Sequence, residues 1–323
     1  MSIKYQIKKI VFGTVVDQMT EQHIQNNNIP KTRDEAKKYG KAERYIYSYR
    51  TAEKVMAVMN RVAKHSGITD IRHLRKKHTA EYLKHHIKKK STKNTLLTER
   101  YGIRKFEKCM ISTGWLSKYD DSICPTNVKI PKGSRINPIG RYNLKETKII
   151  LKYIQDYNKE IAAGLKIQQS VGLRISELKE LKVKHINIKE RKVIIKDNMA
   201  KGGRYRCISI DQSDLKFFKN LIKNKDEEEK IISISKRWIQ KITNKTCEEK
   251  NIKKRGTHGM RGLFAHKRLK KYCQIKNIKF DIKHFIDGPI STLAKEEVKI
   301  LRLVSNDLGH NRISIIRKHY LQR

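Results

Sequence analysis

Five short motifs in the second half of the sequence carry side chains that could act together on a phosphate group. In chain order they are "GLRISEL", "KGGRYR", "HGMRGLFAH", "LGH" and "RKHY". Their candidate catalytic positions are Arg174, Lys201, His258, Arg261, His310 and Tyr320. Each motif alone has an ordinary explanation, such as a surface ion pair, a solvated turn lysine or a packing tyrosine. Their occurrence in this order in one chain is harder to explain without a shared function.

Phosphoryl transfer is the chemistry that this set of side chains suits, because it depends on positioning and charge stabilisation. Arginine supplies both, since a guanidinium stays charged and can bind a phosphate through two hydrogen bonds. A tyrosine hydroxyl has an ordinary pKa of about 10, so it needs a base or a positive field before it can attack. A lysine on a mobile turn suits a general acid. By this account the reaction requires neither a metal nor a nucleotide cofactor.

Two local patterns predict the elements that would hold the first two motifs. Arg174 and Glu177 are three residues apart at a predicted helix start, so they share a face of that helix. The stretch "KVIIKDNMAKGGRYRCISI" contains two β-rich runs around Gly202 and Gly203. This pattern predicts a β-hairpin with Lys201 at its turn.

The third motif predicts a helix with two different faces. At about 100° per residue, His258 and Arg261 lie roughly 60° apart on such a helix. Met260, Leu263 and Phe264 fall on the opposite side. We therefore expect the helix to bury its apolar face and to present the imidazole and the guanidinium together on the other.

Together the motifs resemble those of the tyrosine recombinase (phage integrase) family, over roughly residues 143–320. The resemblance implies a site-specific DNA recombinase or integrase that cuts and rejoins DNA strands through a 3′-phosphotyrosyl intermediate. It implies that Tyr320 is the nucleophile and that Arg174 and Arg261 bind the non-bridging oxygens of the scissile phosphate.

The same resemblance implies roles for four further residues. His258 would assist proton movement, and Lys201 would protonate the leaving 5′ oxygen. His310 would donate a hydrogen bond to the phosphate. Glu177 would be a supporting residue that positions the site without reacting.

The spacing of the motifs departs from the family pattern in one respect. Arg261 and His310 are 49 residues apart, about twice the separation that is usual in the family. We expect the extra length near residues 272–299, as an inserted loop or helix that contacts DNA or a neighbouring subunit. Many relatives continue beyond the tyrosine with a helix that docks on a neighbour, so we expect either this insertion or the DNA itself to organise assembly here.

The composition points to a polyanionic partner. The 323 residues include 75 Lys and Arg against 32 Asp and Glu, a formal net charge of +43. A protein that meets several phosphates gains affinity by releasing counterions from nucleic acid. A bias from AT-rich coding would explain part of the lysine content. The net charge nevertheless favours nucleic-acid binding.

Cysteine usage and the N-terminus favour a cytoplasmic, nucleoid-associated protein. The five cysteines are irregularly spaced with no C-x-x-C pair, so neither a disulfide framework nor a zinc site is indicated. The apolar run "IVFGTVV" is too short for a membrane span or a good signal sequence. We interpret it as a strand or a buried segment.

The fold class that these patterns predict is mainly α with a small antiparallel β-sheet (α+β). A helical core-binding domain would precede a tyrosine-recombinase-like catalytic domain. A stretch rich in proline and glycine, "CPTNVKIPKGSRINPIG", is the best linker candidate. The predicted division is an N-terminal segment of unknown role at 1–40, the DNA-binding helical domain at 41–117, the linker at 118–142 and the catalytic domain at 143–323.

Helical periodicity supports this division. In the first part, apolar residues with helical spacing define two buried faces: Ala52, Met56, Met59 and Ala63 on one helix, and Leu96, Ile103, Phe106 and Met110 on the next.

A basic stripe lies on the second of these helices. Arg100, Arg104 and Lys108 recur at every fourth residue, and in a chain this basic we interpret them as contacts to the DNA backbone.

The second part opens with a predicted helix from residue 143. Asn143 and Glu146 have the spacing of a capping box. Ile150, Ile154, Tyr157 and Ile161 are expected to form its core face.

The expected partners are double-stranded DNA with a specific recombination site, a homotetramer on paired sites and accessory DNA-bending proteins, with no membrane. Two other functions fit the same residues. A type IB topoisomerase-like enzyme would use similar chemistry to relax DNA without paired sites. A non-catalytic DNA-binding or architectural protein would use only the charge. The full set of catalytic residue types argues against the latter.

Overall fold

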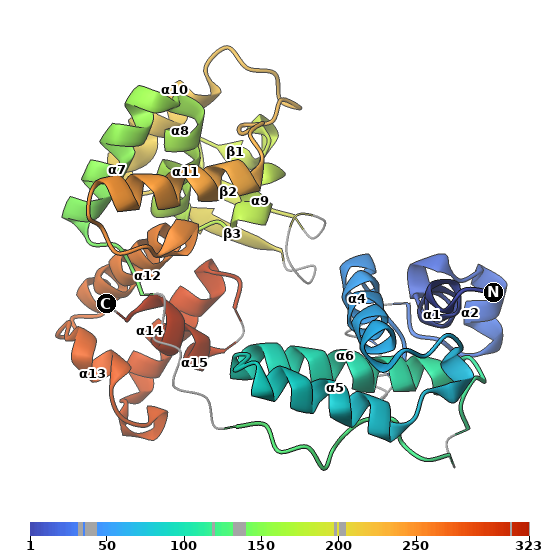
Figure 1. The fold of residues 1–323 in the computed structure, drawn as a ribbon. Helices are drawn as coiled ribbons and strands as arrows, with labels where there is room; N and C mark the ends of the chain where they lie inside the picture. The colour runs from blue at the N-terminus through green and yellow to red at the C-terminus, as the bar shows by residue number, and fades with distance from the viewer. Residues whose placement is uncertain are drawn as a thin grey trace. The chain divides into compact units, whose positions relative to one another are not determined.

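The chain, analysed as a computed structural model, forms two compact units, residues 1–136 and 137–323. The structure describes residues 1–31, 35, 44–117, 120–131, 140–196, 199, 205–310 and 312–322. Figure 1 shows the elements of each unit. The fold is mainly helical with one small antiparallel sheet, as the sequence predicted.

The N-terminal unit is built from helices. They are α1 (Ile3–Phe12), α2 (Glu21–Asn26), α4 (Tyr49–Ser66), α5 (Lys76–Lys88) and α6 (Lys93–Ser112). Helices α1, α4, α5 and α6 pack around one apolar core. The predicted inward faces of α4 and α6 are buried, except that Met56 is only half-buried.

The apolar run "IVFGTVV" is buried, but it does not form a strand. Its first residues lie in α1, where Ile10 and Val11 are buried. Val15 then makes a single parallel bridge to Ile46. The helix wins because Ile7, Ile10 and Val11 share a helical face that packs on α4 and α6.

The C-terminal unit surrounds a second core. Its helices are α7 (Leu144–Tyr157), α8 (Lys159–Val171), α9 (Ile175–Lys179), α10 (Leu215–Ile222), α11 (Lys236–Glu249), α12 (Gly256–Ile275), α13 (Ile282–Ile286), α14 (Lys295–Asp307) and α15 (Ile313–Ile315). A π-helical turn, Ile316–Tyr320, follows α15 directly. Helix α12 packs against α8, α11, α14 and this turn, and so lies at the centre of the unit.

Helix α7 begins with the predicted capping box. Asn143 Oδ1 accepts from the Glu146 N–H at 2.8 Å, and Glu146 accepts from the Asn143 N–H at 2.7 Å. Ile150, Ile154 and Ile161 are buried, but Tyr157 is 60% exposed. The prediction of one helix with a core face through Tyr157 and Ile161 was wrong, because α7 ends at Tyr157. Asn158 ends α7 and caps α8, the separate helix in which Ile161 lies.

The sheet contains the two strands of the predicted hairpin, whose turn around Gly202 and Gly203 lies outside the described residues. Strands β1 (Ile186–Asn187), β2 (Lys192–Ile195) and β3 (Arg206–Ser209) pair antiparallel in the order β1-β2-β3. The register places Ile195 opposite Arg206 and Val193 opposite Ile208. In Figure 1 the strands lie beside α9, the helix that follows Arg174.

The segment that the motif spacing marked as extra length is folded. It comprises the end of α12, the short α13, a 3₁₀ turn at Ile290–Thr292 and the start of α14. Phe285 of α13 is fully buried in the core of the C-terminal unit.

Within the described residues, no helix combines the length and the apolar character needed to cross a membrane.

Candidate active site

Glu177 is the buried centre of a cluster of charges. As the N3 residue of α9, it accepts from the Arg174 backbone N–H at 2.7 Å and from the Arg174 guanidinium at 2.6 Å. Arg206 on β3 donates to the two Glu177 carboxylate oxygens at 3.2 and 2.6 Å. Burial raises the pKa of Glu177, but the hydrogen bond from Arg206 and the nearby arginine charges outweigh it and lower the pKa to about 2. Glu177 is therefore ionised and fixes both guanidiniums.

Arg261 is fully buried on α12. Its two terminal nitrogens donate to the carbonyls of Gly172 and Leu308, and its Nε donates to the Tyr320 hydroxyl at 3.1 Å. Burial lowers the pKa of Arg261 to about 10, so it stays charged at neutral pH. The expectation that Arg261 lies on an exposed face was wrong, because elements packed on several sides of α12 bury 11 of its 20 residues, Arg261 among them. His258 is exposed, as expected.

The turn Leu308-Gly309-His310 is held by both arginines. Arg261 binds the carbonyl of Leu308, and Arg174 donates to the carbonyl of Gly309 at 3.0 Å. Gly309 has φ of +63°, and a Cβ there would lie 2.8 Å from Arg206. Glycine therefore allows both the turn and the close approach of the guanidiniums.

His310 and Tyr320 meet across this turn. His310 Nε2 lies 3.2 Å from the Tyr320 hydroxyl and 3.4 Å from an Arg174 nitrogen. A hydrogen bond from the His310 N–H to Ser305 and another from the Ser305 hydroxyl to the His310 carbonyl fix the histidine backbone.

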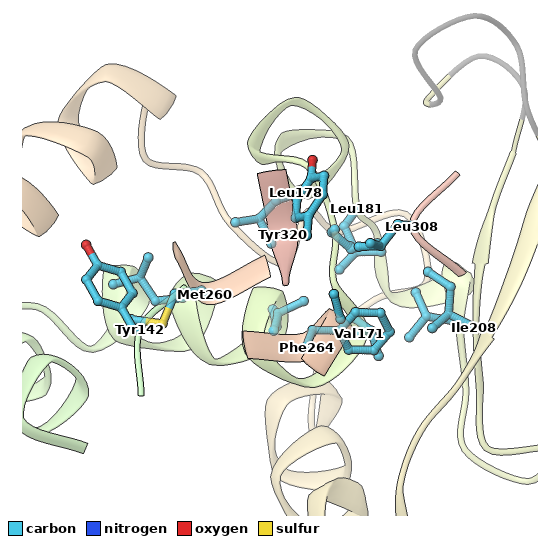
Figure 2. Packing of buried hydrophobic residues seen from close by; sticks show 14 of the residues in the cluster. Tyr142, Val171, Leu178, Leu181, Ile208, Met260, Phe264, Leu308 and Tyr320 are labelled. Carbon is cyan, nitrogen blue, oxygen red and sulfur yellow. The ribbon is translucent and has the colours of Figure 1, made fainter. Parts of the chain in front are cut away.

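Tyr320 lies at the end of the π-helical turn with its ring buried. Figure 2 shows its hydroxyl on the side of the ring that faces away from Phe264 and Val171. The Arg261 guanidinium carbon lies 5.3 Å from the ring centroid. The hydroxyl therefore has an apolar support behind it and two nitrogen groups, from Arg261 and His310, in front.

His258 approaches the same ring from the start of α12, with 6.4 Å between the two ring centroids. Desolvation of its ring, followed by the charges of Arg261 and Arg174, lowers the pKa of His258. Its imidazole is therefore neutral at pH 7 and can accept a proton.

Five of the six predicted catalytic side chains thus converge within the C-terminal unit: Arg174, His258, Arg261, His310 and Tyr320. Lys201 lies outside the described residues.

The predicted stripe on α6 belongs to the N-terminal unit. Arg104 is exposed and Lys108 half-buried, while Arg100 donates to the carbonyl of Val128.

Sequence reasoning missed Arg206. Its side chain is nearly buried, binds Glu177 and donates to the Asp307 carbonyl at 3.1 Å. The signal was present in the alternation of β3, where Arg206 shares the inward face with Ile208. An arginine at an inward position of a strand requires a buried acceptor, and Glu177 is that acceptor.

Known proteins resemble the chain in sequence over part of its length and in fold. Residues 141–281 match the phage integrase family. No curated protein sequence is similar enough to the chain to give a match.

Solved structures of integrases share the fold. One is a Tn1549 transposon integrase in complex with transposon right end DNA, with a TM-score of 0.57 and 13% identity over 98% of this chain and 93% of that one. A second is a lambda integrase dimer bound to a COC′ core site, with a TM-score of 0.59 and 13% identity over 88% and 75%. A third is a lambda integrase tetramer bound to a Holliday junction, with a TM-score of 0.60 and 12% identity over 86% and 74%.

Proposed function

We propose that the chain, whose residues 141–281 match the phage integrase family, is a tyrosine-type site-specific DNA recombinase or integrase. The observation that carries the proposal is the convergence of Arg261 and His310 on the hydroxyl of Tyr320, with Arg174 bonded to the same turn. Two guanidiniums and two imidazoles around one hydroxyl form an anion site that already contains a nucleophile.

The tyrosine hydroxyl occupies a position suited to a phosphate oxygen. Arg261 Nε and His310 Nε2, which lie 3.1 and 3.2 Å from this hydroxyl, are groups that bind phosphate well. A scissile phosphate that takes over these two contacts would release the hydroxyl for attack on phosphorus.

Strand cleavage and rejoining would then proceed as follows. The Tyr320 oxygen bonds to phosphorus while its proton passes to the neutral His258. The bond from phosphorus to the 5′ oxygen breaks, and Lys201 gives that oxygen a proton. The resulting 3′-phosphotyrosyl ester retains the energy of the broken bond, so a second 5′ hydroxyl can reverse the reaction on a new strand without ATP.

The N-terminal unit would hold the DNA duplex. We assign DNA binding to the helical domain at 41–117, with Arg104 and Lys108 as backbone contacts and Arg100 as a weaker candidate because Val128 already engages it. A homotetramer on two paired sites follows as the working assembly. The lambda integrase tetramer on a Holliday junction, which shares the fold, supports this proposal.

A covalent-trapping experiment tests the enzyme assignment. The protein is incubated with DNA that carries its recombination site and a nick close to the cleavage position, and the products are separated on a denaturing gel. We expect a covalent protein–DNA adduct with the unaltered chain and none with Tyr320→Phe, because phenylalanine has no nucleophile.

Two outcomes would contradict the assignment. One is no adduct from the unaltered chain. The other is an adduct that survives Tyr320→Phe. Efficient relaxation of supercoiled DNA without paired sites would instead favour a topoisomerase-like activity.

A further inference from the structure

The nucleophile segment is tied to the inserted segment by one buried arginine. Arg317, three residues before Tyr320, is 8% exposed. Its Nε donates to the carbonyl of Phe285 at 2.7 Å. One terminal nitrogen lies 3.0, 2.9 and 2.8 Å from the carbonyls of the next three residues, Ile286, Asp287 and Gly288. A single guanidinium thus gathers four consecutive carbonyls.

These carbonyls need a partner. They belong to the last turn of α13 and to the residues after it. The last carbonyls of a helix receive no hydrogen bond from an N–H of that helix. Among the described residues, no carboxylate lies within ion-pair distance of Arg317. Carbonyl dipoles therefore compensate its charge, as at helix ends that a cation caps.

The backbone around Arg317 is held from the other side as well. The Arg317 carbonyl accepts from the Gln322 amide at 3.3 Å, and the Gln322 carbonyl accepts from the Arg141 N–H at 3.1 Å. Phe285, whose carbonyl Arg317 binds, shares a buried cluster with Ile316 and Tyr320. The tyrosine segment is consequently fixed between the inserted segment and the start of the C-terminal unit.

We propose that Arg317 and the inserted segment 282–288 act as an anchor within one chain that positions Tyr320 for attack. Arg317 contacts neither the Tyr320 hydroxyl nor the two arginines of the site in any hydrogen bond of the described residues. It is therefore a positioning residue. A shift of about 1 Å at a reacting atom can cost on the order of a hundredfold in rate, so the anchor matters most while the tyrosine is free.

The proposal rests on the proposed function and predicts an asymmetry between the two half-reactions. Before cleavage only the protein positions the Tyr320 hydroxyl. After cleavage the phosphotyrosyl bond fixes the Tyr320 oxygen on the DNA, so the anchor becomes nearly redundant. Loss of the anchor should therefore slow cleavage and leave religation almost unchanged.

The test compares Arg317→Gln with Lys318→Gln, using the full chain on nicked site DNA. Both variants lose one positive charge from the same turn, but Lys318 is exposed. We expect Arg317→Gln to slow single-turnover cleavage by about tenfold or more. Religation from the isolated covalent complex and DNA affinity in a gel shift should stay within about twofold. Lys318→Gln should leave both rates close to those of the unaltered chain, and Arg317→Lys should restore part of the cleavage rate.

Equal losses in cleavage and religation would overturn the proposal, because they would mean that Arg317 supports the whole site. Unchanged cleavage would overturn it as well.

Hydrogen exchange separates this proposal from the enzyme assignment. The peptide that covers residues 313–322 should exchange faster in Arg317→Gln than in Lys318→Gln, even if no covalent adduct forms with the unaltered chain. Equal exchange rates in the two variants would contradict the proposed anchor, whether or not the protein is catalytically active.

Discussion

At the residue scale, the site depends on keeping its buried charges compensated. Glu177 is fully buried and ionised between Arg174 and Arg206. Arg261 has two carbonyls and one hydroxyl as partners. Buried charges of this kind are costly unless every group finds a partner. The same contacts therefore stabilise the fold, hold Arg261 at the hydroxyl of Tyr320 and keep Arg174 beside His310.

Substitution of Glu177 by glutamine tests this coupling through pH. Because the folded pKa is about 2, below the ordinary value of about 4.5, the carboxylate stabilises the folded state above pH 4.5 and loses this effect as the pH falls toward 2. We expect Glu177→Gln to lower the free energy of unfolding by about 3–5 kcal/mol at pH 7. The difference should shrink below pH 4.5. Urea unfolding of a Trp115→Phe chain, which leaves Trp238 in the C-terminal unit as the single tryptophan, measures it.

A difference that stays constant from pH 7 to pH 3 would contradict this account, since it would mean that the carboxylate charge is not what stabilises the cluster.

At the element scale, close packing of helices brings residues that are distant in the sequence into contact in each unit. Helix α12 contributes both His258 and Arg261, and its burial on several sides allows Arg261 to reach the carbonyls of Gly172, the C-cap of α8, and of Leu308. In the N-terminal unit, α4 and α6 approach each other at Gly102. A Cβ on Gly102 would lie 2.7 Å from a methyl carbon of Val58.

Gly102→Ala should therefore destabilise the N-terminal unit, although alanine favours helices by about 1 kcal/mol. Val58 is branched and stiff, so the helices must separate, at a cost of about 1–3 kcal/mol. Urea unfolding of a Trp238→Phe chain follows Trp115 in this unit. The added change Val58→Ala should recover part of the loss caused by Gly102→Ala. A Gly102→Ala chain that is more stable than the unaltered chain would contradict the close contact between Gly102 and Val58.

At the scale of the whole molecule, the net charge of +43 governs how the protein would approach the DNA that we propose it binds. Few acidic residues are available to balance it, and many lysines on both units are exposed. Such a surface attracts DNA before any specific contact forms, and the attraction weakens with salt.

The salt dependence of DNA binding distinguishes contact arginines from structural ones. In a Tyr320→Phe chain, Arg104→Gln should lower the slope of log affinity against log salt by about one unit, because one phosphate contact is lost. Arg100→Gln should change the slope less and lower the stability more, since Arg100 bonds to the carbonyl of Val128. Fluorescence titrations at several salt concentrations measure the slopes. An unchanged slope for Arg104→Gln would show that Arg104 does not contact a DNA phosphate.

The sequence by itself predicted the chemistry that we propose and determined the local elements. Residue types in a fixed order indicated the family, and local patterns predicted the capping box at Asn143 and the strands around Lys201. These features depend on neighbours a few residues away, so their signal is complete in the sequence.

The tertiary structure alone decided which side chains are buried together. The burial of Arg261 and the assembly of Arg206 on Glu177 depend on contacts between segments far apart in the chain. So does the hold of Arg317 on the end of α13. A helical wheel could not predict the first, because it describes a helix in isolation and not the several elements that surround it.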